Sequence, residues 1–487
     1  MVDWFFAPDY RIARWLIERG IAAIYLLAFA CVLDQFPALL GERGFLPVPR
    51  FLNGIRFRDE PTLFRLYYSD RFLRAAGWTG VLLAALLLVG LPQVGPLWLP
   101  MLVWLVLWFL YLSIVNVGQR FYSFGWESLL LEAGFLAIFL GNASTSPPFV
   151  ILLLFRWLVF RVELGAGLIK LRGDPCWREL TCMDFHHETQ PMPGPLSWYF
   201  HRLPRTLHRI EVLGNYAAQL VAPFMLFLPQ PVAGIGALLM IGTQSYLVMS
   251  GNYAWLNALT LVIAFAGLPD AWLSHLWPGT VSAQEFAVAP YWYLVLVLLV
   301  GGLVVVLSYW PVRNLIGPGQ RMNYSFNRLH LVNTYGAFGS VTRERHEVVL
   351  EGTTSEKAFD SAEWQEYEFR AKPGDPRRRP PQFAPYHLRL DWLMWFAALS
   401  PRYAEDWLLP MVHRLLQNDP ATLRLLKRNP FTQAPPAWIR ARLYHYRFTT
   451  GKERQATGAW WVRELVADYF PPVTLPRRGS TRRDTGE

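Results

Sequence analysis

Long apolar runs separated by short polar joints make up the chain as far as about residue 310. A helix that crosses a membrane needs about 20 mostly apolar residues. Such runs recur nine times, at residues 12–33, 72–91, 96–117, 124–141, 149–171, 211–229, 231–250, 252–268 and 290–310. The pattern predicts a multi-pass α-helical membrane protein with about nine spans. The fourth and eighth runs are short or carry charge, so eight or ten spans are also compatible with the sequence.

The first apolar run is expected to remain in the protein as a span. Arg11 and Arg14 flank it, and it continues into Asp34 and Gln35 without a small-residue cleavage site. A secretory signal peptide has a shorter apolar region and ends at such a site.

After Pro311 the pattern changes to that of a water-soluble domain. Strands are predicted at 346–351, 364–370, 439–448 and 460–469, and amphipathic helices at 391–399 and 407–417. The segment 364–370 has the two-residue period of a strand, although its apolar face is impure. The tryptophan-rich helix DWLMWF has two interpretations, a core helix of this domain or a helix lying in the membrane interface.

The sequence therefore predicts two domains. The first is a helical transmembrane domain at 1–310, with long polar loops at 34–71 and 172–210. The second is a soluble α+β C-terminal domain at 311–487. Its polar tail, from about residue 476, is expected to be disordered.

Composition supports the membrane assignment and excludes one class of partner. Of the 487 residues, 53% are hydrophobic and 17% are charged, against about 25% charged in an ordinary soluble domain. The net charge of +10 suits a surface beside anionic headgroups, so membrane lipids are expected partners. Nucleic acid is not expected, because the basic run 377–379 lies among prolines without a groove-reading motif. Arginine outnumbers lysine 41 to 5, which indicates a GC-rich, bacterial genome.

Charged residues inside the apolar runs are the first candidates for function, because ionisable groups in a membrane interior are energetically costly. The fifth run carries Arg156, Glu163 and Lys170, each seven residues from the next. Seven residues at about 100° each leave these positions about 20° apart, so they share one face of the helix. The fourth run carries Glu127 and Glu132. They are about 140° apart and cannot both face the same partner.

This intramembrane polar network has two interpretations; its members are Glu127, Glu132, Arg156, Arg161 and Glu163. In the first, the charges pair with one another and hold adjacent helices in register. In the second, they line a polar cavity that binds a ligand or performs proton chemistry. Lys170 is then the candidate catalytic base, with Glu163 and Arg156 beside it, because burial disfavours the charged form of a lysine.

The polar segment GDPCWRELTCMDFHHETQPMPG, residues 173–194, holds two of the three cysteines. Cys176 and Cys182 have five residues between them, whereas redox pairs of the thioredoxin type have two and structural zinc pairs have two to four. Three interpretations follow: a local structural disulfide, two free thiols, or a metal site that includes His186 or His187. The disulfide is favoured if the segment lies outside the cytoplasm. No metal site and no cofactor is predicted.

The same segment offers candidates for binding a client protein or a ligand, with a solvated turn as the alternative. These candidates are Trp177, Asp184, His186, His187 and Glu188. The third cysteine, Cys31, lies inside the first apolar run and is expected to be inert packing.

Several long runs resemble the lipase maturation factor family. They include FGWESLLLEAGFLAIFL at 124–140, GLIKLRGDPCWRELTCMDFHHETQPMP at 167–193 and LVNTYGAFGSVTRERHEVVLEGT at 331–353, and the likeness covers nearly the whole chain. The resemblance implies a multi-span protein of the endoplasmic reticulum type with a tail domain in the lumen. It also implies a chaperone-like factor that helps dimeric lipases mature, so a lipase or another exported hydrolase is the expected client. The chain itself has no Gly-x-Ser-x-Gly nucleophile elbow.

A shorter stretch, residues 165–180, is similar to part of the vitamin K-dependent γ-carboxylase-like membrane domain. That likeness implies a membrane enzyme with Lys170 as its base, which we keep as the alternative to a non-enzymatic maturation factor. A small-molecule transporter is a third hypothesis, although no inverted repeat is visible.

The positive-inside rule and the family resemblance predict opposite orientations in the membrane. Nine spans place the loops 34–71, 118–123 and 172–210 on the same side as the tail, and these loops carry the arginines. The positive-inside rule would put that side in the cytoplasm. The family resemblance puts it in the lumen, equivalent to a bacterial exterior, and we favour this orientation. The expected location is the inner membrane of a bacterium, or the endoplasmic reticulum membrane of a eukaryote. No pattern predicts an oligomeric state.

Overall fold

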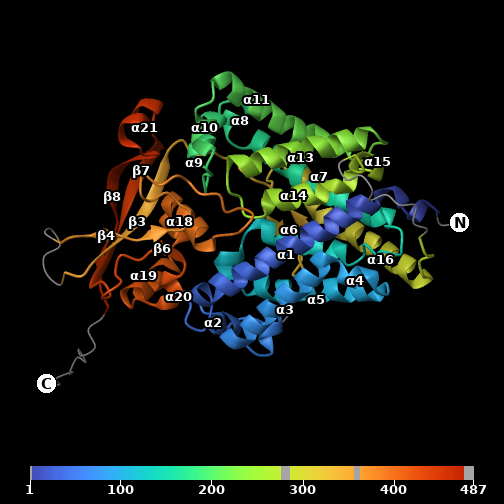
Figure 1. Cartoon of the computed structure of the whole chain (residues 1–487), viewed down its shortest axis with the longest axis horizontal. Coiled ribbons are helices and arrows are strands. Elements are labelled where there is room, and N and C mark those ends of the chain that lie inside the picture. The colour runs from blue at the N-terminus through green and yellow to red at the C-terminus, as the bar shows by residue number, and fades with distance from the viewer. Residues whose placement is uncertain (1–2, 57, 276–285, 356–361, 476–487) are drawn as a thin grey trace.

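The computed structural model describes residues 3–56, 58–275, 286–355 and 362–475. Figure 1 shows a helical bundle with a mixed helix-and-strand domain at one end of the long axis, and the N-terminus at the other end. The tail expected to be disordered from about residue 476 lies outside the described residues. The domain boundary near residue 310 stays a prediction.

The described residues contain five helical segments that are long and apolar enough to cross a membrane. They are α1 (Arg11–Leu39), which a short 3₁₀ turn extends back to Pro8, α3 (Asp70–Val89), α5 (Trp98–Asn116), α13 (Val232–Ser250), and α16 (Tyr291–Leu307) with its continuation α17 (Tyr309–Ile316). Many large apolar side chains on their outer faces are exposed, among them Leu82, Leu238 and Leu299. Such faces are unfavourable in water and suit contact with lipid. The prediction of an integral helical membrane protein is confirmed, whereas nine crossings stay a prediction.

The other four apolar runs form helices that are shorter, interrupted or charged. They contain α6 (Gly125–Ala137), α7 (Phe149–Arg172), α14 (Leu256–Ala264), and a broken segment made of α11 (Arg205–Tyr216), the π-helical stretch Ala217–Val221 and α12 (Ala222–Met225). The charged α7 packs between α6, α14 and α16. Its charges are thereby kept away from lipid. Short helices fill the joints: α2 (Val48–Asn53), α4 (Leu91–Val94), α8 (Pro175–Arg178), α9 (Met183–Thr189), α10 (Ser197–His201) and α15 (Asp270–Leu273).

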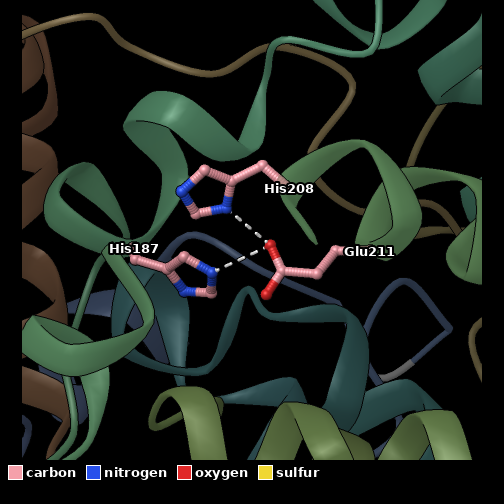
Figure 2. A group of neighbouring side chains, drawn as sticks. All are labelled: His187, His208 and Glu211. Atoms are coloured by element: carbon pink, nitrogen blue, oxygen red, sulfur yellow. Dashed lines mark hydrogen bonds and ion pairs between the residues drawn. The ribbon is translucent and has the colours of Figure 1, made fainter. Parts of the chain in front are cut away.

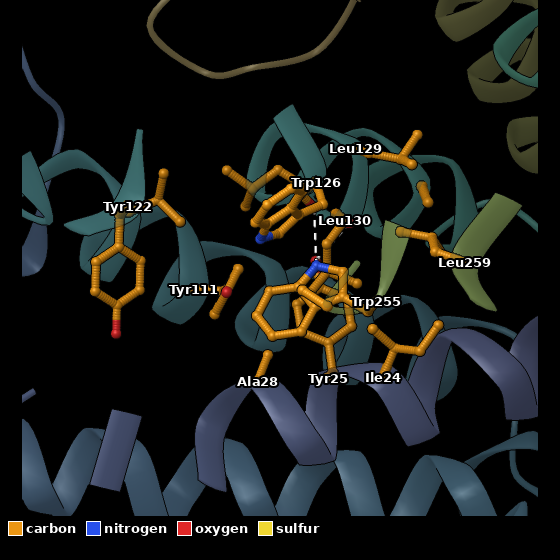
Figure 3. Packing of buried hydrophobic residues seen from close by; sticks show 14 of the residues in the cluster. Ile24, Tyr25, Ala28, Tyr111, Tyr122, Trp126, Leu129, Leu130, Trp255 and Leu259 are labelled. Atoms are coloured by element: carbon orange, nitrogen blue, oxygen red, sulfur yellow. Dashed lines mark hydrogen bonds between the residues drawn. The ribbon is translucent and has the colours of Figure 1, made fainter. Parts of the chain in front are cut away.

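The middle of the bundle is an aromatic core between α1, α5, α6 and α14 (Figure 3). Tyr25 of α1 is fully buried there, and its hydroxyl donates to the Leu130 carbonyl at 3.1 Å. The indole of Trp255 donates to the Trp126 carbonyl at 2.9 Å. Buried aromatic residues thus fill the interior while their polar tips find backbone acceptors, as such residues require.

The C-terminal domain is built on a four-stranded antiparallel sheet in the order β4-β3-β7-β8. Its strands are β3 (Arg345–Thr353), β4 (Gln365–Glu366), β7 (Trp438–Phe448) and β8 (Trp461–Val473). Its helices are α18 (Arg389–Leu399), α19 (Leu408–Leu416), α20 (Pro420–Leu423) and α21 (Gly451–Thr457). Two small strand pairs lie outside this sheet, β1 (Tyr324–Ser325) with β2 (Asn333–Thr334), and β5 (Glu368–Phe369) with β6 (Leu426–Arg428).

Most of the elements predicted for this region are confirmed, with one error. The single strand expected at 364–370 is divided into β4 and β5, which belong to different sheets. Tyr367, between them, is buried and donates its backbone N–H to the Leu350 carbonyl at 3.0 Å. The tryptophan-rich helix is α18. It is a core helix, because it packs on β3 and its Trp392 ring meets Trp126 of α6 edge to face.

A buried ion pair joins the C-terminal domain to the bundle. Arg389 of α18 donates to the Glu127 carboxylate of α6 at 2.6 Å and to the Phe121 carbonyl at 2.8 Å, and both charged side chains are fully buried. The guanidinium also lies 3.5 Å from the centre of the Tyr122 ring. The backbone N–H of Arg389 donates to the amide oxygen of Gln35 on α1 at 3.0 Å. Two helices of the bundle therefore fix the position of α18.

Replacing Glu127 with Gln is expected to destabilise the whole protein. The substitution leaves the Arg389 cation buried without its carboxylate, which costs about 3–5 kcal/mol in buried pairs. Asp406→Asn is the matched control, because it breaks the exposed pair between Arg120 and Asp406, and such pairs contribute about 1 kcal/mol or less. The measurement is the unfolding midpoint of each purified full-length variant in the same detergent. Equal midpoints for the two variants would contradict the assigned role of the buried pair.

Candidate functional site

The segment 173–194 folds back against both parts of the molecule. Asp174 caps α8 by accepting the Cys176 backbone N–H at 3.0 Å. The Arg343 guanidinium donates to the two oxygens of the same carboxylate at 2.9 and 3.1 Å. These hydrogen bonds from Arg343 lower the pKa of Asp174, which therefore stays ionised. A side chain at Gly173 would collide with the Gly339 carbonyl, so glycine allows the chain before β3 to lie directly on this turn.

Cys176 and Cys182 are joined as a disulfide in the structure, with their Cα atoms 4.8 Å apart. Both residues are buried in a small apolar cluster, which also contains Trp177, Met183, Val212 and Val341. The ring is short, so it fixes the local shape of the segment.

Arg345, the first residue of β3, holds the other end of the segment. Its buried guanidinium donates to three backbone carbonyls of the segment, those of Glu188 at 3.1 Å, Gln190 at 2.5 Å and Pro191 at 3.1 Å. It also pairs with Glu347 at 2.5 Å. One strand of the C-terminal domain thus organises the backbone of the polar loop.

Further contacts make the loop 172–210 and the C-terminal domain one continuous surface. The Glu188 carboxylate accepts the Phe448 backbone N–H at 2.6 Å, and the Trp198 indole donates to the Thr449 carbonyl at 2.9 Å. Burial raises the pKa of Glu188. Glu188 therefore contacts the C-terminal domain, and Trp177 lies in the cluster around the disulfide. Asp184 lies near the surface, 4.0 Å from the exposed Arg205. Their role in binding a client stays a prediction.

The face of α7 that carries Arg156, Glu163 and Lys170 contacts uncharged groups. Lys170 donates to the side-chain oxygens of Asn215 at 2.7 Å and Gln219 at 3.0 Å, and its ammonium lies 4.9 Å from the centre of the Trp177 ring. Among the described residues, no ion pair joins any two of the three charges at 156, 163 and 170. Lys170 is thus positioned by amide oxygens rather than by a carboxylate.

The other two charges of that face follow the same pattern. Arg156 donates to the carbonyls of Ala266 at 2.8 Å and Leu226 at 3.1 Å. Glu163 accepts from the amide of Gln244 at 2.7 Å. The face therefore binds α13 and the ends of neighbouring helices, and these contacts cross-link the bundle.

Glu132 and Arg161 form another buried ion pair, between α6 and α7. Arg161 also donates to the Asn333 carbonyl at 2.6 Å, and Glu132 accepts from the Asn333 backbone N–H at 3.0 Å and from the Tyr335 hydroxyl at 2.8 Å. Glu127 and Glu132 thus serve different partners, in agreement with their angular separation on α6.

A separate polar cluster lies between α9 and α11 (Figure 2). His208 and Glu211 are three residues apart on α11 and therefore share a face. The His208 Nδ1 atom lies 2.8 Å from the Glu211 Oε2 atom. His187 of α9 approaches the same oxygen with its Nε2 atom at 3.5 Å. The three ligand-type atoms all lie within 4.8 Å of one another.

The two adjacent histidines of the segment have different surroundings. His186 has a different partner and shares a 3.0 Å hydrogen bond with the Tyr253 hydroxyl. Burial lowers the pKa of His186 to about 3, and burial also lowers the pKa of His187, so both rings are neutral at physiological pH. Neither His208 nor Glu211 is among the candidates that the sequence pattern predicts. Their spacing in RTLHRIEVL was the available signal, but nothing local connects it to His187.

Fold and contacts define a multi-pass membrane protein whose strand-containing C-terminal domain is locked onto one end of its helical bundle. Comparison with known families identifies it further. The Lipase maturation factor transmembrane domain matches residues 12–275, and the Lipase maturation factor C-terminal domain matches residues 331–471. The chain belongs to the lipase maturation factor family.

Curated relatives align over nearly the whole chain. Lipase maturation factor 1 of Bos taurus is 43% identical, with 96% of this chain and 90% of that protein covered. Lipase maturation factor 1 of Homo sapiens is 42% identical, with 98% and 90% covered. Lipase maturation factor 2 of Gallus gallus is 31% identical, with 96% and 82% covered. A comparison with solved structures finds no match. The chain is thus a lipase maturation factor-like membrane protein.

Peptide mapping without reduction is expected to recover Cys176 and Cys182 in one linked pair and Cys31 as the free thiol. The expected result follows from the contact between the two sulfur atoms in the segment and from the burial of Cys31 in α1. The protein is alkylated under denaturing conditions, digested and analysed by mass spectrometry before and after reduction. Alkylation of both Cys176 and Cys182 before reduction would contradict the disulfide.

Proposed function

We propose that this chain helps exported lipases or other exported hydrolases reach their active fold, and that the client binds outside the cytoplasm. The alignment of lipase maturation factors over nearly the full chain is the observation that carries the proposal. It includes both the membrane part and the C-terminal domain. The comparisons do not favour the γ-carboxylase-like or transporter alternatives.

The outer strand β8 is the proposed contact for an incompletely folded client. In the described part of the chain it is the last strand of the sheet, paired only with β7. Its central residues are exposed, and Leu465 and Val466 are each about half exposed. An open strand edge with apolar side chains can accept an extended segment of another chain by backbone pairing. Backbone pairing of this kind can bind an unfolded segment without requiring one particular sequence.

Deleting the gene is expected to lower the activity per mass of at least one secreted hydrolase, because the client is exported without its active fold. Re-expression of the natural chain should restore that activity. Re-expression of Leu465→Asp/Val466→Asp should not, because charges on the strand edge oppose apolar docking. Leu66→Asp is the matched control, since Leu66 is also exposed but lies in the loop 34–71. Specific activities of secreted hydrolases and the level of each variant in the membrane are measured together.

Two outcomes would decide against the proposal. Unchanged specific activity of every secreted hydrolase after deletion would contradict the maturation role. Full restoration by the doubly charged variant would contradict the role of β8 while leaving the family function in place.

We also propose that the chain crosses the membrane nine times with its C-terminal domain outside the cytoplasm. The loops that the nine-span count assigns to the tail side do contact the C-terminal domain: Gln35 donates to the His387 carbonyl at 2.7 Å, and Arg120 pairs with Asp406 at 2.5 Å. The contact between Glu188 and Phe448 adds the third loop. A disulfide in that loop suits an oxidising compartment, which supports the family orientation over the positive-inside rule.

Reporter fusions to the C-terminus of the full-length chain are expected to give active alkaline phosphatase and no fluorescence from green fluorescent protein. Phosphatase needs disulfides and therefore an oxidising compartment, whereas the fluorescent protein folds in the cytoplasm. The control is the same pair of reporters fused after residue 230, in a joint that nine spans place on the opposite side. Fluorescence from the C-terminal fusion would overturn the proposed orientation.

A further inference from the structure

The cluster of His187, His208 and Glu211 has the donor set of a transition-metal site. Two imidazole nitrogens and one carboxylate are a combination that zinc takes in proteins with three protein ligands, with the fourth position left open. Tetrahedral bonds of about 2.0–2.2 Å place neighbouring ligand atoms about 3.4 Å apart. The separations from Glu211 Oε2 are 2.8 Å to His208 and 3.5 Å to His187, on either side of that value.

The buried imidazole of His187 lacks a strong partner in the protein. The ring is fully buried, its Nδ1 atom has no hydrogen-bond partner among the described residues, and its Nε2 contact with Glu211 is long. Burying a polar group without a good partner is unfavourable. A metal ion between His187 and Glu211 would give the Nε2 lone pair a short bond.

The carboxylate of Glu211 also lacks a cationic partner of its own. Within the described residues its ion-pair contacts are only to His187 and His208, with no Arg or Lys in range. Both histidines bind a metal through a neutral imidazole, so a divalent cation would supply positive charge beside this carboxylate.

One neighbouring group already orients a candidate ligand. The Tyr246 hydroxyl of α13 donates to the second oxygen of Glu211. Hydrogen bonds of this kind hold metal ligands in place. The Glu211 side chain is 11% exposed, so an ion can reach the site from the surface beside α11.

We propose that His187, His208 and Glu211 bind one divalent transition-metal ion of the zinc type, which fastens α9 to α11 and keeps one coordination position open. The proposal goes beyond lipase maturation, because it assigns an ion to the polar loop that contacts the C-terminal domain. The ion would hold the loop on the bundle from one side, as Arg345 holds it from the other. The open position would be filled by water or by a donor atom of a bound molecule.

The test is zinc binding by purified full-length protein in detergent. The protein is treated with a chelator, freed of it by gel filtration, and titrated with zinc chloride, and bound zinc is measured by elemental analysis. About one zinc ion per chain and a higher unfolding midpoint with zinc are expected. Cobalt(II) in place of zinc should give the strong visible absorption of a tetrahedral site.

Variants assign the bound ion to these residues. Glu211→Gln and His208→Gln keep the side-chain size, and both should abolish stoichiometric binding. Tyr246→Phe should weaken binding by about 10–100-fold, because it removes only the hydroxyl that orients Glu211. His186→Gln is the matched control and should bind zinc like the natural chain, since His186 faces Tyr253. Gel-filtration profiles and the disulfide pattern check that each variant is folded.

Failure of the natural chain to retain zinc would overturn the proposal. So would undiminished binding by a folded Glu211→Gln variant, which would place the ion elsewhere. Neither result depends on hydrolase secretion, so the outcome is independent of the proposed client and of the role of β8.

Discussion

The buried pair between Arg389 and Glu127 is the contact on which the arrangement of the two parts depends. Two charges removed from water are stable only with close partners, so each fixes the other. Glu127 lies at the start of α6. The side-chain amide of Gln35 on α1 adds hydrogen bonds to the backbone of His387 and Arg389. Burial beside Arg389 lowers the pKa of His387 to about 3. The neutral ring can therefore accept from the Trp126 indole at 3.3 Å. The C-terminal domain is held at one end of the bundle by polar contacts in an aromatic setting.

The position of the C-terminal domain determines how the segment 173–194 is held. With α18 in place, β3 begins beside the segment 173–194, where Arg345 gathers three carbonyls and Arg343 meets Asp174. The disulfide and the apolar cluster around it shape the segment from within. Loop and domain therefore form one continuous surface.

The charged face of α7 contacts uncharged groups of other helices. Arg156, Glu163 and Lys170 do lie on one side of the helix, but their partners are carbonyl and amide groups of other helices. Neutral oxygens and amides can satisfy a buried charge through hydrogen bonds without a second ion. The face is thus a set of cross-links, while the ion pairs of the network belong to Arg161 with Glu132 and to Glu127 with Arg389.

The sequence by itself determined the features that depend on local periodicity. Apolar runs predicted the helices of the bundle. The strands predicted at 346–351, 439–448 and 460–469 correspond to β3, β7 and β8, and the angle between Glu127 and Glu132 predicted separate partners. Which residues of distant segments contact one another, by contrast, was decided only by the tertiary structure. The division of 364–370 into two sheets and the meeting of His187 with His208 and Glu211 arise from contacts between distant segments. Periodicity records which face of an element is buried, whereas burial against a particular neighbour is a property of the whole fold.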